Sequence, residues 1–374
     1  MEPMVVGATA EGGTGGWWYV GLVCLFVCSG TMQPLLISTL GYNGAYDKST
    51  LLFLLPNYVG MSLAGLLRLD GLFKGTIRAR PLAALCAIDV VSQGLCQYGL
   101  AVAGSSLYIV IYSSCTMWIA IESRILIGRR LAARQWLGCA IVVVGLAVTG
   151  GDVASSLERG GLEMALGASM ILLGSISHAL TWVLVELLLK GSVHKHADDP
   201  ISPEAVSTVM GFAGVATFGL WQLLYTVPRA QALVFDQIAS HGGDSAAIGR
   251  AYLVLTLASL VHAVTFYHLV GQMGAVTAGV MKGCQAVAVF VASDYLFCAA
   301  QASQCFSTAK AWSLVLVVLG TTTYALSGRA PPAPEESMEE IEGTDYRAYD
   351  AADPDAPPAG WARHSDGGFV RIRS

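Results

Sequence analysis

The chain has 374 residues, of which 54% are hydrophobic and 13% are charged, and its formal net charge is −5 at pH 7. A soluble domain usually carries about 25% charged residues, so this composition excludes an ordinary soluble fold. Apolar runs of roughly 20 residues, which is enough to cross a bilayer, recur from Trp17 to Leu326. We therefore expect an all-α membrane protein.

Ten transmembrane helices are predicted in chain order after a short disordered lead at 1–15. They cover about residues 17–40, 51–69, 81–103, 107–127, 133–149, 162–189, 204–227, 251–270, 274–297 and 308–326. A Gly-Ser-Ser break at 104–106 separates the third span from the fourth, and the most polar connection, 191–203, follows the sixth. The Pro- and acid-rich segment 328–374 has no periodic apolar face, so we expect a disordered cytosolic tail.

Ten spans place both termini on one side of the membrane, and the basic residues indicate which side. With a cytosolic N-terminus, the cytosolic loops receive Arg68, Lys74, Arg78, Arg80, Arg129, Arg130, Arg134, Lys190, Lys195 and Arg329. The opposite side receives Lys48, Arg159, Arg229, Arg250 and Lys310. Because cytosolic loops carry an excess of Lys and Arg, both termini are expected in the cytosol.

Two stretches of the chain align without a gap and predict an internal repeat. The pattern GSSL…SS…S from Gly104 to Ser123 lines up with GAVT…GC…S from Gly274 to Ser293, and a basic–Trp pair follows each a few residues later, at 134–136 and 310–312. Spans three to five then match spans eight to ten, which gives five-helix repeats at 16–150 and 151–327. An odd number of spans inverts the second repeat in the membrane, as in many secondary transporters. The alternative is that any two spans rich in Gly, Ala and Ser look alike.

The fourth and fifth spans resemble the drug/metabolite transporter superfamily, with its EamA-type and nucleotide-sugar-transporter-like solute carriers (solute carrier family 35) as the nearest branches. The matching stretches are LIGRRL at 126–131, QWLG at 135–138 and VGL at 144–146, with MKG at 281–283 and the span-three aspartate Asp89. The resemblance implies two inverted five-helix units, a central cavity and alternating access. It also implies nucleotide sugars, sugar phosphates or other small metabolites as substrates, and the Golgi, ER, vacuole or another endomembrane as the location. Nucleotide-sugar carriers often hold a second lysine in the fourth helix, where this chain has Cys115, so one anion contact of such a substrate is missing.

Lys282 is the leading candidate for substrate binding. It lies eight residues beyond Gly274, which places it ~12 Å inside the membrane. A lysine at such depth costs roughly 2.5–3.5 kcal/mol and indicates a function. It is expected to attract an anionic group of the substrate. The alternative is a structural ion pair with Asp89, which lies at a similar depth from the cytosolic end of its span.

The other candidate side chains share a helix face with Lys282 or Asp89, stand at the matching place in the repeat, or could carry a transported proton. They are Gln33, Tyr58, Gln93, Tyr112, Ser113, Ser114, His178, Trp182, His262 and Gln285. Trp182 is added because it lies four residues from His178, and Gln33 and Tyr58 are weaker candidates for the cavity wall. For most of these candidates the alternative is a polar contact between packed helices, which is common in membrane bundles.

We expect a secondary-active transporter for a small polar or anionic metabolite and not an enzyme, because there is no phosphate-binding loop and no catalytic or zinc motif. The alternatives are a transport-inactive scaffold or sensor, and a proton-coupled exporter of amines or drugs. Expected partners are a small-molecule substrate and membrane lipid, with no nucleic acid, cofactor or metal, and a homodimer is left open. Cys298 and Cys305 flank one polar loop and could form a disulfide if that loop faces an oxidising lumen.

Overall fold

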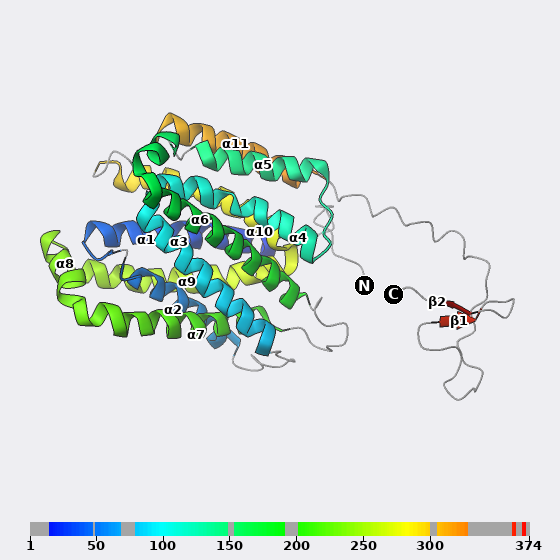
Figure 1. Ribbon diagram of the computed structural model, residues 1–374, viewed down its shortest axis with the longest axis horizontal. Coiled ribbons are helices and arrows are strands. Elements are labelled where there is room, and N and C mark those ends of the chain that lie inside the picture. Colours follow the sequence, from blue (N-terminus) through cyan, green and yellow to red (C-terminus); the bar gives the residue numbers. More distant parts are fainter. Residues whose placement is uncertain are drawn as a thin grey trace. The chain divides into compact units, whose positions relative to one another are not determined.

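The computed structural model describes residues 15–47, 49–68, 79–148, 153–190, 201–299, 305–327, 361–363 and 369–371. The chain divides into two units, Met1–Gly328 and Arg329–Ser374. In the first unit every described regular element is helical (Figure 1). The α-helices are α1 (Gly15–Tyr42), α2 (Leu55–Leu63), α3 (Ala79–Ser113), α4 (Cys115–Leu126), α5 (Ala133–Ala147), α6 (Val153–Leu189), α7 (Pro203–Trp221), α8 (Asp236–Ser240), α9 (Ser245–Met273), α10 (Ala275–Phe297) and α11 (Thr308–Ala325).

Short helical turns extend two of these helices. Turns of 3-10 type at Leu52–Leu54 and Ala64–Arg68 flank α2, and π-type and 3-10 turns fill Gln222–Phe235 between α7 and α8. Helix starts follow their local sequence. Ser202 caps α7 by accepting a hydrogen bond from the amide of Ala205, and Asp244 caps α9 in the same way from Ala246.

Within the described residues, six helices are long and apolar enough to cross a membrane. They are Trp17–Tyr42, Ala79–Leu100, Leu162–Leu189, Pro203–Arg229, Ser245–Met273 and Ala275–Phe297. Shorter apolar helices occupy Leu52–Arg68 and Ala133–Ala147. Large apolar side chains such as Leu253, Leu173 and Val144 are more than half exposed on the outside of the bundle, whereas Asp89 and Glu186 are buried inside it. This inside-out distribution is that of a multi-pass membrane protein.

The chain reverses direction inside α3. Gly99 packs against Ile171 of α6, and so does Tyr108, yet Tyr112 lies further along α6, against His178. A straight helix would carry Tyr112 away from Ile171 in the other direction. The chain therefore turns back between Gly99 and Tyr108. The backbone is nevertheless helical through 104–106, where the sequence predicts a break between two helices, and the next helix begins at Cys115.

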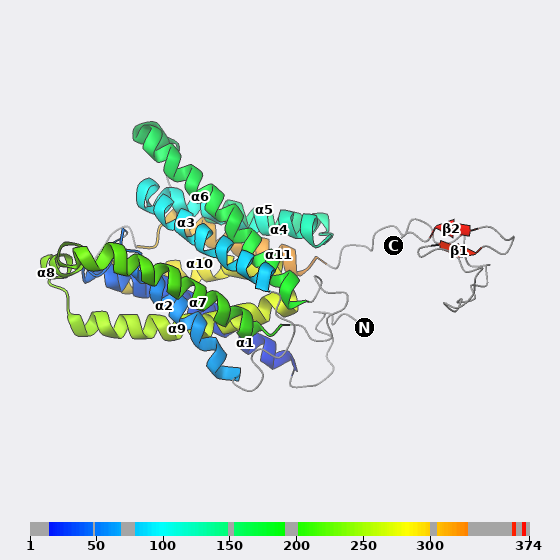
Figure 2. The same cartoon turned by 60° about the horizontal axis from the view of Figure 1, so that its bottom comes forward.

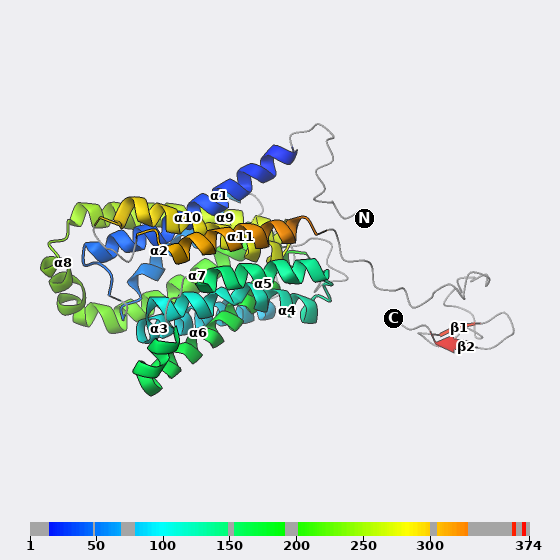
Figure 3. The same ribbon diagram turned by 90° about the horizontal axis from the view of Figure 1, so that it is seen from above.

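Packing between the helices follows a regular scheme. α3 packs on α6 and α1 on α9, α4 packs on α6 and α10 on α1, and α2 packs on α7 (Figure 2). α5 and α11 lie side by side (Figure 3). They cross where Gly138 faces Gly320, so closely that a Cβ atom on either glycine would lie 2.8 Å from the carbonyl oxygen of the other. Small residues allow such close approach of helices in membranes.

The second unit contains two three-residue strands, β1 (Trp361–Arg363) and β2 (Phe369–Arg371), paired antiparallel with Ala362 opposite Val370. They lie in the tail for which the sequence predicts no regular structure, and these residues depart from that expectation. The rest of the predicted tail lies outside the described residues, as does the predicted lead at 1–14.

Candidate functional site

A cavity of about 330 Å³ lies among α1, α2, α3, α6, α9 and α10. We call it the polar chamber, because eight of the described side chains that line it, its tyrosines left aside, can hydrogen-bond through amide, carboxylate, aliphatic hydroxyl or imidazole groups. These are Gln33, Asn57, Asp89, Gln93, Gln97, Thr181, His178 and His262. Lys282, Tyr58, Tyr112 and Trp182 also line it. The chamber therefore joins nine of the residues predicted to bind substrate.

The Lys282 ammonium is held by aromatic groups. Its Nζ donates a hydrogen bond to the Tyr112 hydroxyl at 3.2 Å and lies 5.3 Å from the centroid of the Tyr112 ring and 5.1 Å from that of Trp182. Among the described residues, no carboxylate lies within 4.0 Å of this nitrogen, so the alternative of a structural ion pair with Asp89 is not realised. Two ring faces stabilise a cation but leave it without a counter-charge.

His178 is placed between Tyr112 and Trp182 in the chamber wall. The Trp182 indole N–H donates to His178 Nε2 at 3.2 Å, and an indole nitrogen cannot accept. The proton of a neutral His178 must therefore sit on Nδ1. Nδ1 is buried and has no hydrogen-bond partner among the described residues. His178 thus presents an unused donor near the ammonium.

Asp89 has a different environment from Lys282. Its Oδ2 accepts a hydrogen bond of 2.8 Å from the Tyr58 hydroxyl, and the Tyr58 ring stacks on Phe218 with centroids 5.3 Å apart. Both side chains are nearly inaccessible, at 6% for Asp89 and 1% for Tyr58. The carboxylate is thereby fixed on α3, where it faces the chamber together with Gln93.

His262 is tied to α1. Its Nδ1 lies 3.2 Å from the Phe26 carbonyl oxygen, to which it donates, and its ring stacks on Phe26 at 4.7 Å. Two glutamine side chains in the chamber wall keep unused polar atoms, Gln33 Nε2 and Gln97 Oε1. Buried polar atoms of this kind are rare in native proteins, and they are accounted for when a ligand or water occupies the space in front of them.

A second cavity of about 350 Å³ shares Tyr108, Tyr112, Trp182 and Lys282 with the first. We call it the apolar chamber, because most of its remaining wall is apolar. This wall consists of Pro34, Cys115, Thr116, Ile119, Leu146, Gly279, Gly283, Gln285, Ala286, Val289 and Phe290. Gln285, a predicted substrate-binding residue, thus lies in the second chamber, where its Oε1 has no partner among the described residues.

Ser114 departs from its predicted place in the cavity. Its hydroxyl donates to the carbonyl oxygen of Ile111 at 2.6 Å and accepts from the Trp118 indole at 3.2 Å, and it lines neither chamber. Serine in a helix readily bonds back to its own backbone in this way. The side chain of Ser113 lies outside the described residues.

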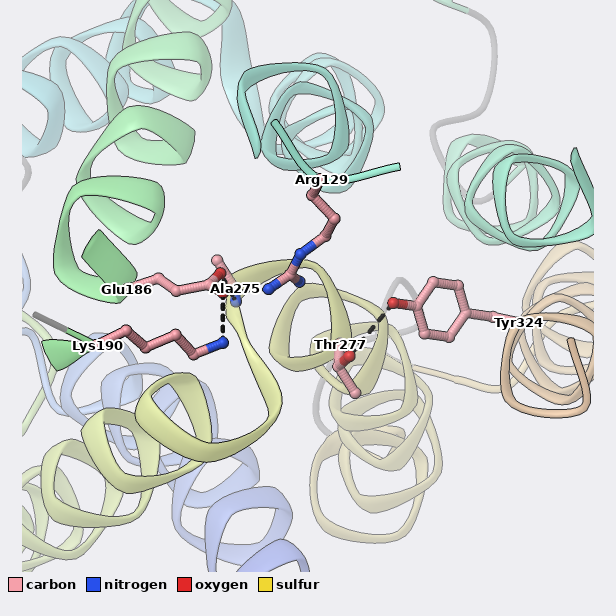
Figure 4. A network of polar contacts seen from close by, with 6 residues as sticks. All are labelled: Arg129, Glu186, Lys190, Ala275, Thr277 and Tyr324. Atoms are coloured by element: carbon pink, nitrogen blue, oxygen red, sulfur yellow. Dashed lines mark hydrogen bonds and ion pairs between the residues drawn. The ribbon is translucent and has the colours of Figure 1, made fainter. Parts of the chain in front are cut away.

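A network of polar contacts around Glu186 lies at one end of the bundle (Figure 4). Glu186 Oε1 forms ion pairs with Arg129 and, at 2.6 Å, with Lys190, and Oε2 accepts a hydrogen bond of 2.7 Å from the amide of Ala275. The network joins the link after α4, the end of α6 and the start of α10. We call this end of the bundle the Glu186 end.

The sequence predicts no role for Glu186, and it indicates Arg129 only as part of the orientation signal. A fully buried carboxylate with two cationic partners can be identified only once the three segments are brought together, although the i,i+4 spacing of Glu186 and Lys190 was visible.

A second polar cluster surrounds Glu204 at the start of α7. Glu204 contacts Arg68, in the turn after α2, and His268 of α9 at 3.5 Å each.

The opposite end of α10 carries a disulfide between Cys298 and Cys305. Together with Asp294 these two residues form the one set of clustered metal-ligand types found in the described part of the chain. Because the two sulfurs are bonded to each other, the set does not form a metal site.

Comparisons with known proteins identify the fold and no family. No family model matches the chain, and no curated protein is similar to it. Solved structures are similar in fold. One of them, described only as the crystal structure of a protein, has a TM-score of 0.62 over 82% of this chain and 96% of the other, at 15% identity. The fold and the site together define a multi-pass membrane protein whose first unit is helical in its described elements and surrounds the two chambers.

Proposed function

We propose that this protein is a secondary-active carrier that moves a small polar or anionic metabolite across a membrane. The observation that carries the proposal is the Lys282 ammonium, which borders the polar chamber with aromatic partners and with no carboxylate within 4.0 Å in the described structure. A charge inside a membrane bundle usually marks a substrate or ion pathway. An anionic substrate would supply the missing counter-charge, and the unused atoms of His178, Gln33 and Gln97 would bind its polar groups.

Ten spans in two inverted five-helix repeats are part of this proposal. We number the ten proposed spans in chain order and exchange the first five with the last five. The packing scheme keeps its form, because each packed pair in it corresponds to another packed pair or to itself. The α3–α6 contact then corresponds to the α9–α1 contact, and the α4–α6 contact to the α10–α1 contact. The reversal in α3 corresponds to the sharp turn at Gly274 between α9 and α10. Inverted repeats support alternating access, because each half can rock against the other.

The orientation is proposed on two grounds that agree. A disulfide persists in an oxidising compartment, so the end with Cys298–Cys305 would face a lumen or the exterior. The Glu186 end would then face the cytosol, as the distribution of Lys and Arg predicts. A sugar phosphate or nucleotide sugar as the substrate, and an endomembrane as the location, remain proposals from the resemblance alone.

The scaffold or sensor alternative requires polar side chains that meet across helix interfaces without space between them. The chamber of about 330 Å³ counts against that alternative. A proton-coupled exporter of amines would bind its cation at a carboxylate in the chamber. Asp89 is the one carboxylate among the described side chains that line the polar chamber; it is 6% exposed and accepts a hydrogen bond from Tyr58.

The test is exchange by purified protein in liposomes, with a panel of labelled sugar phosphates, nucleotide sugars and organic acids. We expect exchange of at least one anion, and a loss of more than tenfold in Lys282→Met with partial recovery in Lys282→Arg. The control is Arg250→Ala. The Arg250 side chain is 71% exposed and lies at the end of the bundle opposite the Glu186 end, so this variant should exchange substrate at the wild-type rate. Wild-type exchange by Lys282→Met would refute the proposed role of the ammonium.

A further inference from the structure

The two chambers meet at one group of side chains. Lys282, Tyr112, Tyr108 and Trp182 line both cavities, so the ammonium lies in the partition between a polar space of about 330 Å³ and an apolar space of about 350 Å³. Of the described side chains that line the apolar chamber, Lys282 is the one that carries a charge.

The chemistry of the two walls differs sharply. On the polar side the wall contains carboxylate, amide and imidazole groups, several with unused polar atoms. On the apolar side Ile119, Val289, Phe290 and Leu146 provide aliphatic and aromatic surface, and Gln285 is the main polar exception. A hydroxyl-rich anion would fill the first space and leave the second without a matching group.

We propose that the substrate is an amphipathic organic anion, with its charged group at Lys282 and an aromatic or branched aliphatic group in the apolar chamber. This inference rests on the proposed function and narrows its substrate class. The shared ammonium supplies the charge complementarity, and the rings of Tyr112 and Trp182, which lie 5.3 and 5.1 Å from Lys282 Nζ and line both chambers, would contact the ligand where it passes from one chamber to the other. Burying a phenyl-sized group there gains roughly tenfold to a hundredfold in affinity.

The experiment compares inorganic phosphate with phenyl phosphate as probes of the purified full-length protein, by thermal shift titration in lipid nanodiscs. Phenyl phosphate is expected to bind roughly tenfold to a hundredfold more tightly. Val289→Phe narrows the apolar chamber and should remove this preference while phosphate still binds. Val291→Phe is the matched control, because Val291 lies two residues along α10, about 200° around the helix, and is 53% exposed.

Val289→Ala keeps the test decisive if Val289→Phe does not fold. The enlarged chamber should then favour naphthyl phosphate over phenyl phosphate by several-fold more than the wild type does. Lys282→Met should bind none of the probes. This variant therefore distinguishes binding at Lys282, between the two chambers, from non-specific uptake of the probes into the lipid.

Each remaining outcome refutes a defined step. Equal affinity for phosphate and phenyl phosphate overturns the amphipathic inference and leaves the anion carrier standing. A preference for phenyl phosphate that survives in both Val289→Phe and Lys282→Met overturns the inference as well, since it reports a lipid-like site elsewhere. Binding of neither anion by the wild type overturns both this inference and the role of Lys282 in the proposed function.

Discussion

Replacement of Glu186 by glutamine tests whether the Glu186 network holds one end of the bundle closed. The substitution preserves volume and removes the charge that pairs with Arg129 and Lys190. Breaking a buried ion pair from one side costs about 3–5 kcal/mol. Here Arg129 and Lys190 keep side-chain exposures of 21% and 33%, so both can regain water and the cost falls to about 2 kcal/mol.

A shift of about 2 kcal/mol changes the ratio of closed to open states roughly 30-fold, at 1.4 kcal/mol per factor of ten. The change should appear where the network joins the helices. We expect faster hydrogen–deuterium exchange at the first turn of α10 and in the link between α4 and α5. The packed pair α5 and α11, which meets at Gly138 and Gly320, should exchange at its wild-type rate.

Asp294→Asn is the matched control, an acid-to-amide change at the other end of α10, where Asp294 accepts a hydrogen bond from the Phe306 amide at 2.7 Å. It should leave exchange at the start of α10 unchanged. Unaltered exchange there in Glu186→Gln would refute the view that this network keeps the end closed. Equal acceleration throughout the bundle would refute it too, because that pattern reports general destabilisation.

Three further substitutions test single contacts. Gly274→Ala should lower the melting temperature, because Gly274 has a φ of 87° and a Cβ would lie within 2.8 Å of the Glu186 carboxylate; wild-type melting would contradict this placement. Tyr58→Phe removes the hydroxyl that donates to Asp89 and should cost about 1–3 kcal/mol in denaturant unfolding, whereas a neutral effect would mean that water replaces it. Cys298→Ser should lower the melting temperature as much as reductant lowers that of the wild type, and an additional effect of reductant on the variant would indicate another disulfide.

The elements that the sequence predicts best are those with a strong local pattern. Apolar runs indicated the helices, and a lysine inside such a run indicated Lys282, because no local context explains a charge at that depth. The Gly-Ser-Ser composition at 104–106 predicted a break between two helices, whereas α3 is helical through these residues and ends at Ser113. The disulfide was suggested by two cysteines that flank one short loop.

Features that depend on tertiary contacts could not be predicted in the same way. Asp89 and Lys282 lie at a similar depth in the membrane, yet depth does not determine the direction in which a side chain points around its helix. Asp89 instead accepts a hydrogen bond from Tyr58 on another helix. Ser114 was predicted from the repeat, but its hydroxyl donates a hydrogen bond to its own helix backbone. Gln285 was predicted from the helix face that it shares with Lys282, but it lines the apolar chamber. Glu186 was missed because an acid near the end of a span resembles an ordinary interfacial residue.

The stability of Lys282→Met can separate a functional lysine from a structural one. The charge costs roughly 2.5–3.5 kcal/mol at this depth. Its contacts with Tyr112 and Trp182 offset about 0.5–2 kcal/mol each as cation–π interactions. The balance runs from about 2.5 kcal/mol unfavourable to about 1.5 kcal/mol favourable and is centred slightly on the unfavourable side, whereas methionine would fill the same space at no charge cost.

We therefore expect Lys282→Met to unfold at the same temperature as the wild type or higher when no substrate is present, and to lose stabilisation by anions. Residues kept for function commonly reduce stability in this manner. The measurement is a pair of melting curves in nanodiscs, without and with the phosphate probes. A fall of several degrees in the ligand-free variant would mean that the ammonium holds the helices together, and the case for an anion-binding lysine would lose its energetic basis.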